Sequence, residues 1–600
     1  MRFVFAIISF VLAAVLMGLG IGERTFLAGP DEVTASTTET TTSPVLVIDG
    51  SALNAYERGQ TVEIAGTPTI AAAYGRTEDV LAWVGDATYT HVTYDAETAS
   101  LVSTVETGSE TQVPQLAGSD LWLREYTGEA TLRFRTNLPD TVSIIAVSDG
   151  ITPAPSTVSV SWPLDNSAPW SGPLVIGGGL FLLIGLALLI WALTHMRKSR
   201  GPRRTQQKQP KMPKLPRQPR YKPKKAKAIS GPAPTDKGRR MRRVGIVVPF
   251  VLAGSVALAG CSAATAPATS SDTAVPTATA TADPSSELGT PAVTAAQVED
   301  IMSDIGTVVA EADANRDEDL LATRVSGAAL YLRLANYKVA AVDAAVADDV
   351  TPIPPSVVSI IVPEQTKAGV WPRRVFAIVS EETDPAAVVD PENPVIAPTA
   401  VMLVQEDARS NYKVDYAVTL QAGVEIPEMP SSTVGAARVS PDARFLQMAP
   451  SAIAGAYADV MLKDTESEFN DMFASEGDQL RGRIGVAAQQ ALLAELPATA
   501  KETFTRAAGD AEVIAMSTLD SGAIVTVQMT ETDTVESIKT GAIVKVPARL
   551  QPLVGKENAP KGITATYSDQ MLFYIPFADS TEKIQLLGYS AGLVEAKEIP

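Results

Sequence analysis

The 600-residue chain contains one cysteine, Cys261, and two histidines, His91 and His195. A single cysteine excludes disulfides within the chain and any cysteine-rich zinc site. Because no histidine follows His195, Ser-His-Asp and Cys-His catalysis are excluded for residues 261–600. The sequence also contains no P-loop and no G-x-G-x-x-G motif. It therefore predicts no catalytic residues, no metal site and no cofactor site.

Positive charge is concentrated in one stretch. The formal net charge is -19, yet residues 197–243 contain 19 Lys or Arg and a single acid, Asp236. Interleaved prolines favour an extended polyproline conformation there. The positive-inside rule places this stretch in the cytoplasm and the acidic remainder outside. Tyr221 is its one aromatic residue, so contact with anionic lipid headgroups is favoured over nucleic acid binding.

Two long uncharged apolar runs predict membrane-spanning helices, Phe3–Ile21 and Leu174–Leu193. A cleaved signal peptide is the alternative for the first run, but Phe26 occupies a position where cleavage needs a small residue. In the second run, Gly177–Gly179 either let another helix approach closely or face lipid.

A third apolar run, Val244–Gly260, follows a cluster of arginines and ends at the only cysteine. Its last residues, Leu258-Ala259-Gly260-Cys261, resemble the lipobox of bacterial lipoprotein signals. That resemblance implies diacylglycerol on Cys261 and cleavage immediately before it, with membrane lipid as the partner. The alternative is an uncleaved third transmembrane helix, since 17 residues can just span a bilayer.

Between the first two runs, residues 45–168 contain short β-branched segments separated by Asp-Gly turn signals. This pattern predicts an antiparallel β-sandwich. His91 alternates with threonine and valine in one such segment, which indicates a polar cross-strand neighbour; a ligand or catalytic role is the alternative. Residues 31–44, before the β-rich part, are Thr-rich and predict an unpacked stalk.

Beyond a Ser/Thr/Ala/Pro-rich tether, helical and strand patterns occur in the same order twice, at roughly 291–430 and 445–600. The first helix, at 294–312, begins with a capping box of Thr294 and Gln297. Its predicted apolar stripe consists of Val298, Ile301, Ile305, Val308 and Ala312. The repeated order resembles tandem NTF2-like cone domains, in which a curved sheet wraps over helices.

The acidic stretch 313–319 resembles a calcium loop at first sight. However, Glu318 occupies the position that requires glycine, and Arg324 the position that requires the closing glutamate. We therefore expect an acidic turn that caps a helix at 320–336. The acid pair Glu381-Glu382 could serve carboxylate chemistry, but solvated surface is the ordinary interpretation of such a pair.

Taken together, these patterns predict a multidomain membrane protein with an extracytoplasmic all-β sandwich-like domain, transmembrane helices and a C-terminal α+β domain pair. Residues 22–172 and 261–600 are expected outside the cell, and 196–243 inside. The predicted segments are an anchor helix (1–24), stalk (31–44), β-rich domain (45–168), transmembrane helix (174–193), basic linker (196–243), lipoprotein-signal-like segment (244–261), tether (262–290) and two α+β domains (291–430 and 445–600).

The layout resembles uncharacterised envelope proteins of high-GC Gram-positive (actinobacterial) cells, in the segment DGITPAPSTVSVSWP and in the lipoprotein-like half. It favours a non-catalytic, membrane-anchored binding or assembly protein, with cell-wall glycan or another envelope protein as partner. Two alternatives stay open. One is an enzyme or accessory subunit of envelope glycan metabolism, acting by glycosyl transfer or hydrolysis. The other is a transmembrane sensor that signals through the basic linker.

Overall fold

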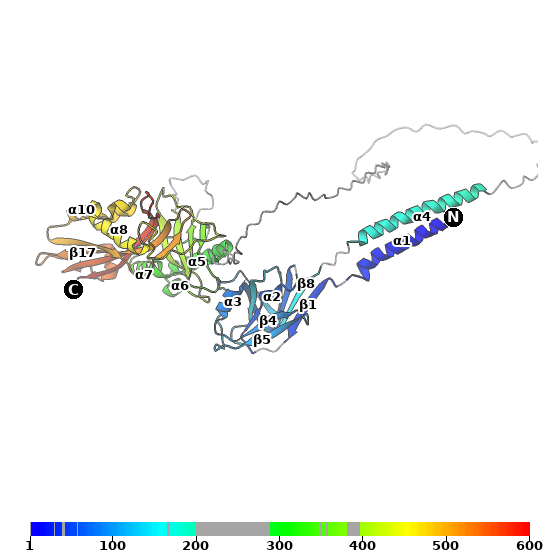
Figure 1. The fold of residues 1–600 in the computed structure, drawn as a ribbon. Helices are drawn as coiled ribbons and strands as arrows, with labels where there is room; N and C mark the ends of the chain where they lie inside the picture. Colours follow the sequence, from blue (N-terminus) through cyan, green and yellow to red (C-terminus); the bar gives the residue numbers. More distant parts are fainter. Residues whose placement is uncertain are drawn as a thin grey trace, which may run out of the picture. The chain divides into compact units, whose positions relative to one another are not determined.

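The computed structural model of the chain describes residues 2–28, 30–38, 42–56, 58–164, 169–199, 289–348, 350–355, 358–380 and 397–600. These residues form two compact units: a pair of helices, and a larger unit that contains residues 28–167 and 282–600 (Figure 1). The predicted lipoprotein-signal-like segment lies outside the described residues, as do nearly all of the predicted basic linker and tether.

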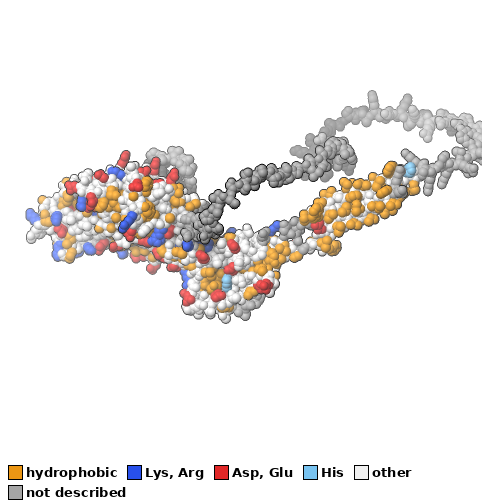
Figure 2. Space-filling model, viewed as in Figure 1, with side chains coloured by type: hydrophobic (Ala, Val, Ile, Leu, Met, Phe, Trp, Pro, Cys, Tyr) orange, Lys and Arg blue, Asp and Glu red, His pale blue; other side chains and the backbone are white. Residues whose placement is uncertain are grey.

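The two helices are α1 (Arg2–Thr25) and α4 (Ser171–Ser199), and both are long and apolar enough to cross a membrane. Hydrophobic side chains cover their surface (Figure 2). They pack antiparallel, because Gly20 lies beside Ser171 while Gly185 lies beside Phe10. A Cβ atom added at Gly178 would lie 2.5 Å from Met17 Cγ. The sequence left two interpretations of Gly177–Gly179, close approach of another helix or exposure to lipid. Gly178 fits the first, because α1 packs directly against it.

We predict that Gly178→Leu pushes α1 and α4 apart, whereas Gly179→Leu leaves them packed, since nothing lies within 4 Å of a Cβ at Gly179. Cross-linking tests this in a Cys261→Ser background. Cysteines at positions 9 and 185 are close enough to cross-link, because a Cβ at Gly185 would lie 3.3 Å from Ser9 Cβ, slightly under the roughly 3.5–4.5 Å usual for a disulfide. The disulfide yield should fall severalfold with Gly178→Leu only. Equal yields in both variants would contradict this packing.

Residues 30–164, called the β-domain, form one eight-stranded sheet in the order β1-β8-β3-β7-β2-β4-β5, with β6 paired to β3. The sheet curls until its ends meet, since Thr37 Oγ1 on β1 lies 3.0 Å from Ser103 Oγ on β5. Apolar side chains from all eight strands fill the interior. The strands are β1 (Glu32–Thr38), β2 (Val45–Ile48), β3 (Gln60–Arg76), β4 (Tyr89–Asp95), β5 (Ser100–Glu106), β6 (Arg124–Thr136), β7 (Val142–Val147) and β8 (Thr157–Pro163).

The structure confirms a β-rich domain but differs from the prediction in four ways. The sheet is mixed, because β2 and β4 run parallel, and it curls on itself instead of forming two stacked layers. The predicted stalk contains β1, which pairs with β8 along its whole length because alternate residues such as Val33 and Ala35 face apolar neighbours. Two short helices, α2 (Gly50–Leu53) and α3 (Thr77–Val84), replace stretches expected as strand or turn.

Residues 289–600, called the C-terminal domain, are α+β as predicted. The longer helices are α5 (Ala295–Asn315), α6 (Glu318–Arg324), α7 (Gly327–Val342), α8 (Ile453–Lys463), α9 (Gln479–Ile484), α10 (Val486–Glu495) and α11 (Gln551–Val554). The large sheet contains β10 (Val358–Pro363), β12 (Arg373–Val379), β13 (Thr399–Gln405), β14 (Lys413–Leu420), β15 (Ala500–Ala508), β16 (Ile514–Ser517), β17 (Ala523–Ser537), β20 (Gly562–Ile575) and β21 (Gln585–Glu598). Two-residue strands β9 (Thr290–Pro291), β11 (Gln365–Thr366), β18 (Val544–Lys545) and β19 (Asn558–Ala559) form two small ladders.

The two halves of this domain share one sheet, in which β14 and β21 pair through Thr419–Tyr589 and Leu420–Gly588. Alternation along each strand sorts the side chains into separate cores. One face of β12–β14 packs on α5–α7, and one face of β17 and β20 packs on α8 and α9. The opposite faces pack on each other in a third core. The predicted helices-then-strands order therefore holds in each half, but the halves form a single packed body.

Several local predictions for the C-terminal domain can be compared with the structure. The helix expected at 320–336 is split into α6 and α7 by an extended turn around Ser326. Strand β15 was not predicted, because its sequence AKETFTRAA has little hydrophobic alternation. The capping box of Thr294 and Gln297 is confirmed. In the stripe of α5, Val309 is fully buried where Val308 was expected.

Candidate functional site

Helix α3 of the β-domain presents a carboxylate to the C-terminal domain. Asp79, in the first turn of α3, accepts hydrogen bonds from both terminal guanidinium nitrogens of Arg373, with Nη1 3.1 Å from Oδ2. The Gly369 amide donates to Oδ1 at 2.8 Å, and Arg76 Nε donates to Oδ2 at 3.0 Å. The side chains of Asp79 and Arg373 are 4% and 1% exposed. A bidentate, buried pair of this kind is strong and geometrically specific.

The other end of α3 is bound by an arginine of the C-terminal domain. Arg409 donates to the carbonyl oxygens of Trp83 and Val84, each at 2.7 Å, and to Glu110 Oε2 at 2.8 Å. Carbonyls at a helix C-terminus carry partial negative charge, so a cation is favourable there, as an acid is at the N-terminus. Both ends of α3 are therefore electrostatically matched to the domain that covers it.

Apolar packing and a second ion pair complete this contact, which we call the α3 interface. Trp371 and Ala408 of the C-terminal domain pack into the same apolar cluster as Trp83. Nearby, Asp120 Oδ2 accepts from Arg324 Nη1 at 2.5 Å and from the Tyr412 amide at 2.8 Å. Burial raises the pKa of Asp120, and Arg324 opposes that rise. Removing one member of a buried pair leaves an uncompensated charge, which costs about 3–5 kcal/mol.

A second polar site is a cavity of about 230 Å³ within the C-terminal domain. It lies between α9–α10 and the sheet. Its polar lining comprises Asp348, Arg483, Gln489, Arg506, Glu531, Asp533, Arg549 and Tyr567. Arg506 Nη1 donates to Asp533 Oδ1 at 2.8 Å. Glu531 Oε2 and Arg506 Nε lie 3.5 Å apart, and both are buried without a hydrogen-bond partner.

The carboxyl groups at this cavity have altered acidity. Burial raises the pKa of Glu531 to about 6, although Arg506 opposes the rise. Behind the cavity, burial and the charge of Glu531 raise the pKa of Asp569 to about 8. Asp569 is fully buried, and neither of its oxygens has a hydrogen-bond partner. Its nearest cation is Arg483, with Nη2 3.8 Å from Oδ1. Burial therefore favours the uncharged form of the Asp569 carboxyl group.

Residues 289–598 match the model of a family described as "Domain of unknown function (DUF8094)". The chain belongs to the DUF8094 family. No curated protein and no solved structure matches it. The family match covers both predicted α+β halves together, which agrees with their shared sheet. The C-terminal domain is called the DUF8094 domain from here.

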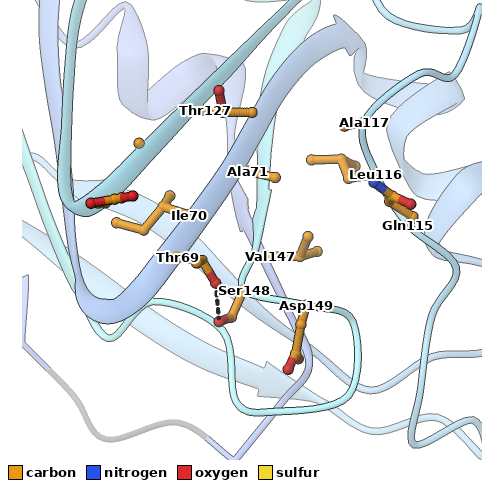
Figure 3. A pocket seen from close by; sticks show the side chains of 12 residues that line it. Thr69, Ile70, Ala71, Gln115, Leu116, Ala117, Thr127, Val147, Ser148 and Asp149 are labelled. Carbon is orange, nitrogen blue, oxygen red and sulfur yellow. Dashed lines mark hydrogen bonds between the residues drawn. The ribbon is translucent and has the colours of Figure 1, made fainter.

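A cavity of about 750 Å³ in the β-domain lies outside the DUF8094 domain (Figure 3). Its labelled side chains are mostly short and uncharged, and the Thr69–Ser148 hydroxyl contact is long, at 3.5 Å. Asp149 is already engaged, since its Oδ1 accepts from the Ile151 and Thr152 amides. The lining contains no cation. This cavity therefore offers space without a set of groups that would perform chemistry.

Most residues singled out from the sequence do not meet in a site. Cys261, Leu258, Ala259, Gly260 and the pair Glu381-Glu382 lie outside the described residues. The imidazole of His91 lies 3.2 Å from Asp49 Oδ2 on the β-domain, as a polar neighbour. In the acidic stretch 313–319, Asp317 caps α6 by accepting from the Leu320 amide, as predicted. Within the described residues, no cluster of three His, Cys, Asp or Glu side chains could hold a metal ion.

Both sites consist of residues that the sequence patterns did not indicate. Asp79 and Asp120 occur among ordinary surface-type acids, and their partners lie about 200 to 300 positions away in the chain. One signal was present: Arg373-Arg374 begins a strand whose seven residues are all buried. Asp569 likewise lies in a buried part of β20, between Ser568 and Gln570. Charged residues inside a buried strand require partners, so they indicate a polar site.

Proposed function

We propose that the protein is a non-catalytic, membrane-anchored cell-envelope protein with an assembly role, in which the β-domain docks the DUF8094 domain. The observation that carries this proposal is the α3 interface. Asp79 is buried between Arg76 of its own domain, which donates one hydrogen bond, and Arg373 of the other domain, which supplies the bidentate contact. A surface that buries a charge in this way is selective for the partner that supplies the counter-charge.

The topology predicted from the sequence agrees with this role. The β-domain is connected at both ends to the antiparallel helices α1 and α4, so both connections emerge at the same end of the helix pair. If these helices span the membrane, the chain leaves α4 on the opposite side, next to the basic linker. Docking then requires one more crossing, and the apolar run 244–260 is long enough to provide it. We propose this arrangement, with both folded domains outside the cell.

The α3 interface also matters for the predicted cleavage before Cys261. If Cys261 is acylated and the chain is cut before it, the helix pair with the β-domain and the DUF8094 domain become separate polypeptides. The α3 interface would then hold an acylated chain against a two-helix anchor. Continuity of the backbone between residues 199 and 289 is not needed for any contact of Asp79, Asp120 or Arg409.

Cleavage of the purified chain tests this proposal. A protease site inserted within residues 205–235 allows the full-length protein to be cut after purification in detergent. We expect the two fragments to co-elute in size-exclusion chromatography at micromolar concentration, and to separate in denaturant. Separate elution under native conditions would contradict an assembly role for the interface.

An enzyme acting on envelope glycans through carboxylates is the second candidate function. The observation in its favour is the raised pKa of Glu531, about 6, because a carboxyl group with such a pKa can act as a general acid near neutral pH. Incubation of the purified chain with cell-wall glycan separates the two functions. Turnover that is lost in Glu531→Gln would support the enzyme and reject the non-catalytic role.

A further inference from the structure

Two buried polar atoms of the DUF8094 cavity have no hydrogen-bond partner within the protein. Glu531 Oε2 needs a hydrogen-bond donor and Arg506 Nε needs an acceptor, yet these atoms lie 3.5 Å apart without bonding each other. The two side chains are 8% and 2% exposed. Leaving such buried groups unpaired costs about 1–3 kcal/mol each. A hydroxyl group both donates and accepts, so a single hydroxyl placed between them would satisfy both atoms.

Two arginines at the rim of the cavity, Arg483 and Arg549, donate no hydrogen bond to a carboxylate among the described residues. Arg483 and Arg549 are exposed. Arg549 Nη2 donates to the neutral hydroxyl of Tyr567 at 2.7 Å, and among the described residues no carboxylate lies within 4 Å of its guanidinium. Arg483 lies closest to Asp569, whose uncharged form is favoured by burial. Guanidinium groups of this kind bind carboxylate or phosphate.

The other two acids that line the cavity, Asp533 and Asp348, already accept hydrogen bonds from the protein. Asp533 accepts from Arg506, and Asp348 Oδ2 accepts from the Leu593 amide at 3.1 Å. The volume, about 230 Å³, is below the roughly 300–1,000 Å³ of sites for drug-sized ligands. The cavity therefore has room for one small polar ligand, with hydroxyl groups at one end and a negative charge at the other.

We propose that this cavity binds a single acidic sugar residue, with a ring hydroxyl between Glu531 and Arg506 and a carboxylate or phosphate against Arg483 and Arg549. Tyr567 also lines the cavity, and the Arg549 guanidinium lies over its ring, 5.2 Å from the centroid. All lining residues belong to the DUF8094 domain, so the inference does not depend on docking at the α3 interface.

Calorimetric titration of the purified full-length chain tests this proposal with four probes: glucuronate, glucose 6-phosphate, glucose and inorganic phosphate. We expect saturable binding of at least one of the two acidic sugars, at least tenfold tighter than glucose or inorganic phosphate. Glucuronate and glucose 6-phosphate distinguish a carboxylate from a phosphate as the charged group. Arg549→Ala and Glu531→Gln should each weaken the bound sugar at least tenfold. Arg444→Ala, an exposed arginine outside this cavity, serves as the matched control and should not change affinity.

Three results would overturn the proposal. The first is the absence of binding by both acidic sugars at 10 mM. The second is equal binding of glucose, which would remove the role of the rim arginines. The third is equal binding of inorganic phosphate, which would reveal an anion site without sugar recognition. Arg549 is exposed, so its variant should fold even if a change at buried Glu531 disturbs the sheet. The fragment co-elution experiment reports on docking separately.

Discussion

Replacing Asp79 with asparagine is expected to separate the two halves of the cleaved chain. Asparagine keeps the shape of the side chain but removes the charge that faces Arg373, which is 1% exposed. The guanidinium would then be buried without a counter-charge, at a cost of about 3–5 kcal/mol. Because each 1.4 kcal/mol is a factor of ten in affinity, the dissociation constant of the fragments should rise at least a hundredfold. Surface plasmon resonance between the two fragments measures this change directly.

Asp140→Asn is the matched control, because Asp140 is an exposed acid of the same domain and takes no part in the α3 interface. A second variant, Asp120→Asn, should also weaken association, since Arg324 and the Tyr412 amide would lose their shared acceptor charge. Unchanged affinity in Asp79→Asn, with an unchanged circular dichroism spectrum, would show that the buried pair does not hold the domains together.

The second large effect is expected from Asp569→Asn, and it depends on pH. The pKa of Asp569 is raised from 3.8 to about 8, first by burial and then by the negative charge of Glu531; Asp533 raises it further, while Arg483 and Arg506 oppose the rise. Between pH 4 and 8 the folded state therefore holds a proton that the unfolded state releases. Stability due to this group is fully present below the unfolded pKa and is lost as pH rises toward about 8, by up to about 1.4 kcal/mol per pH unit.

Asparagine is uncharged at every pH, so the variant should lose this slope, and its stability relative to wild type should rise by up to about 3 kcal/mol between pH 6 and pH 8. Hydrogen exchange of amides in β20, measured at pH 6 and pH 8 and corrected for intrinsic rates, gives the opening free energy. Asp579→Asn, an exposed acid just after the same strand, should retain the wild-type slope. A parallel slope in wild type and Asp569→Asn would mean that this carboxyl group does not titrate in the folded state.

The fold class of each part followed from local patterns, whereas the pairing of elements did not. The capping box at Thr294, the apolar runs of α1 and α4 and most strands of the DUF8094 domain are encoded by neighbouring residues. Strand β1 was mistaken for a stalk because threonine is typical of both tethers and strands, and only its pairing with β8 distinguishes them. The apolar residues of α3 favour a strand, whereas Glu78 and Asp79 in its first turn are typical of a helix N-terminus.

The sites were less predictable than the fold, for a physical reason. A charge becomes functional when distant elements exclude water from it, and no local pattern contains that information. Asp79 and Arg373 are 294 positions apart, and Glu531 faces Arg506 only because β15 pairs with β17. The scarcity of histidine and cysteine leaves mainly charged side chains for a polar site, but composition does not indicate which of them are buried.

The most direct test of the central proposal is a disulfide across the α3 interface in native membranes. A Cβ at Gly369 lies 3.6 Å from Glu78 Cβ, within the range for a disulfide. Cysteine at position 369 must adopt a left-handed backbone, φ +73°, at a cost of about 1–2 kcal/mol, which a docked interface can bear. In a Cys261→Ser chain carrying Glu78→Cys, Gly369→Cys and a protease site within 205–235, we expect mild oxidation to join the cut fragments into one band on a non-reducing gel. Two separate bands after oxidation, as in the single-cysteine controls, would contradict docking of the DUF8094 domain on the β-domain.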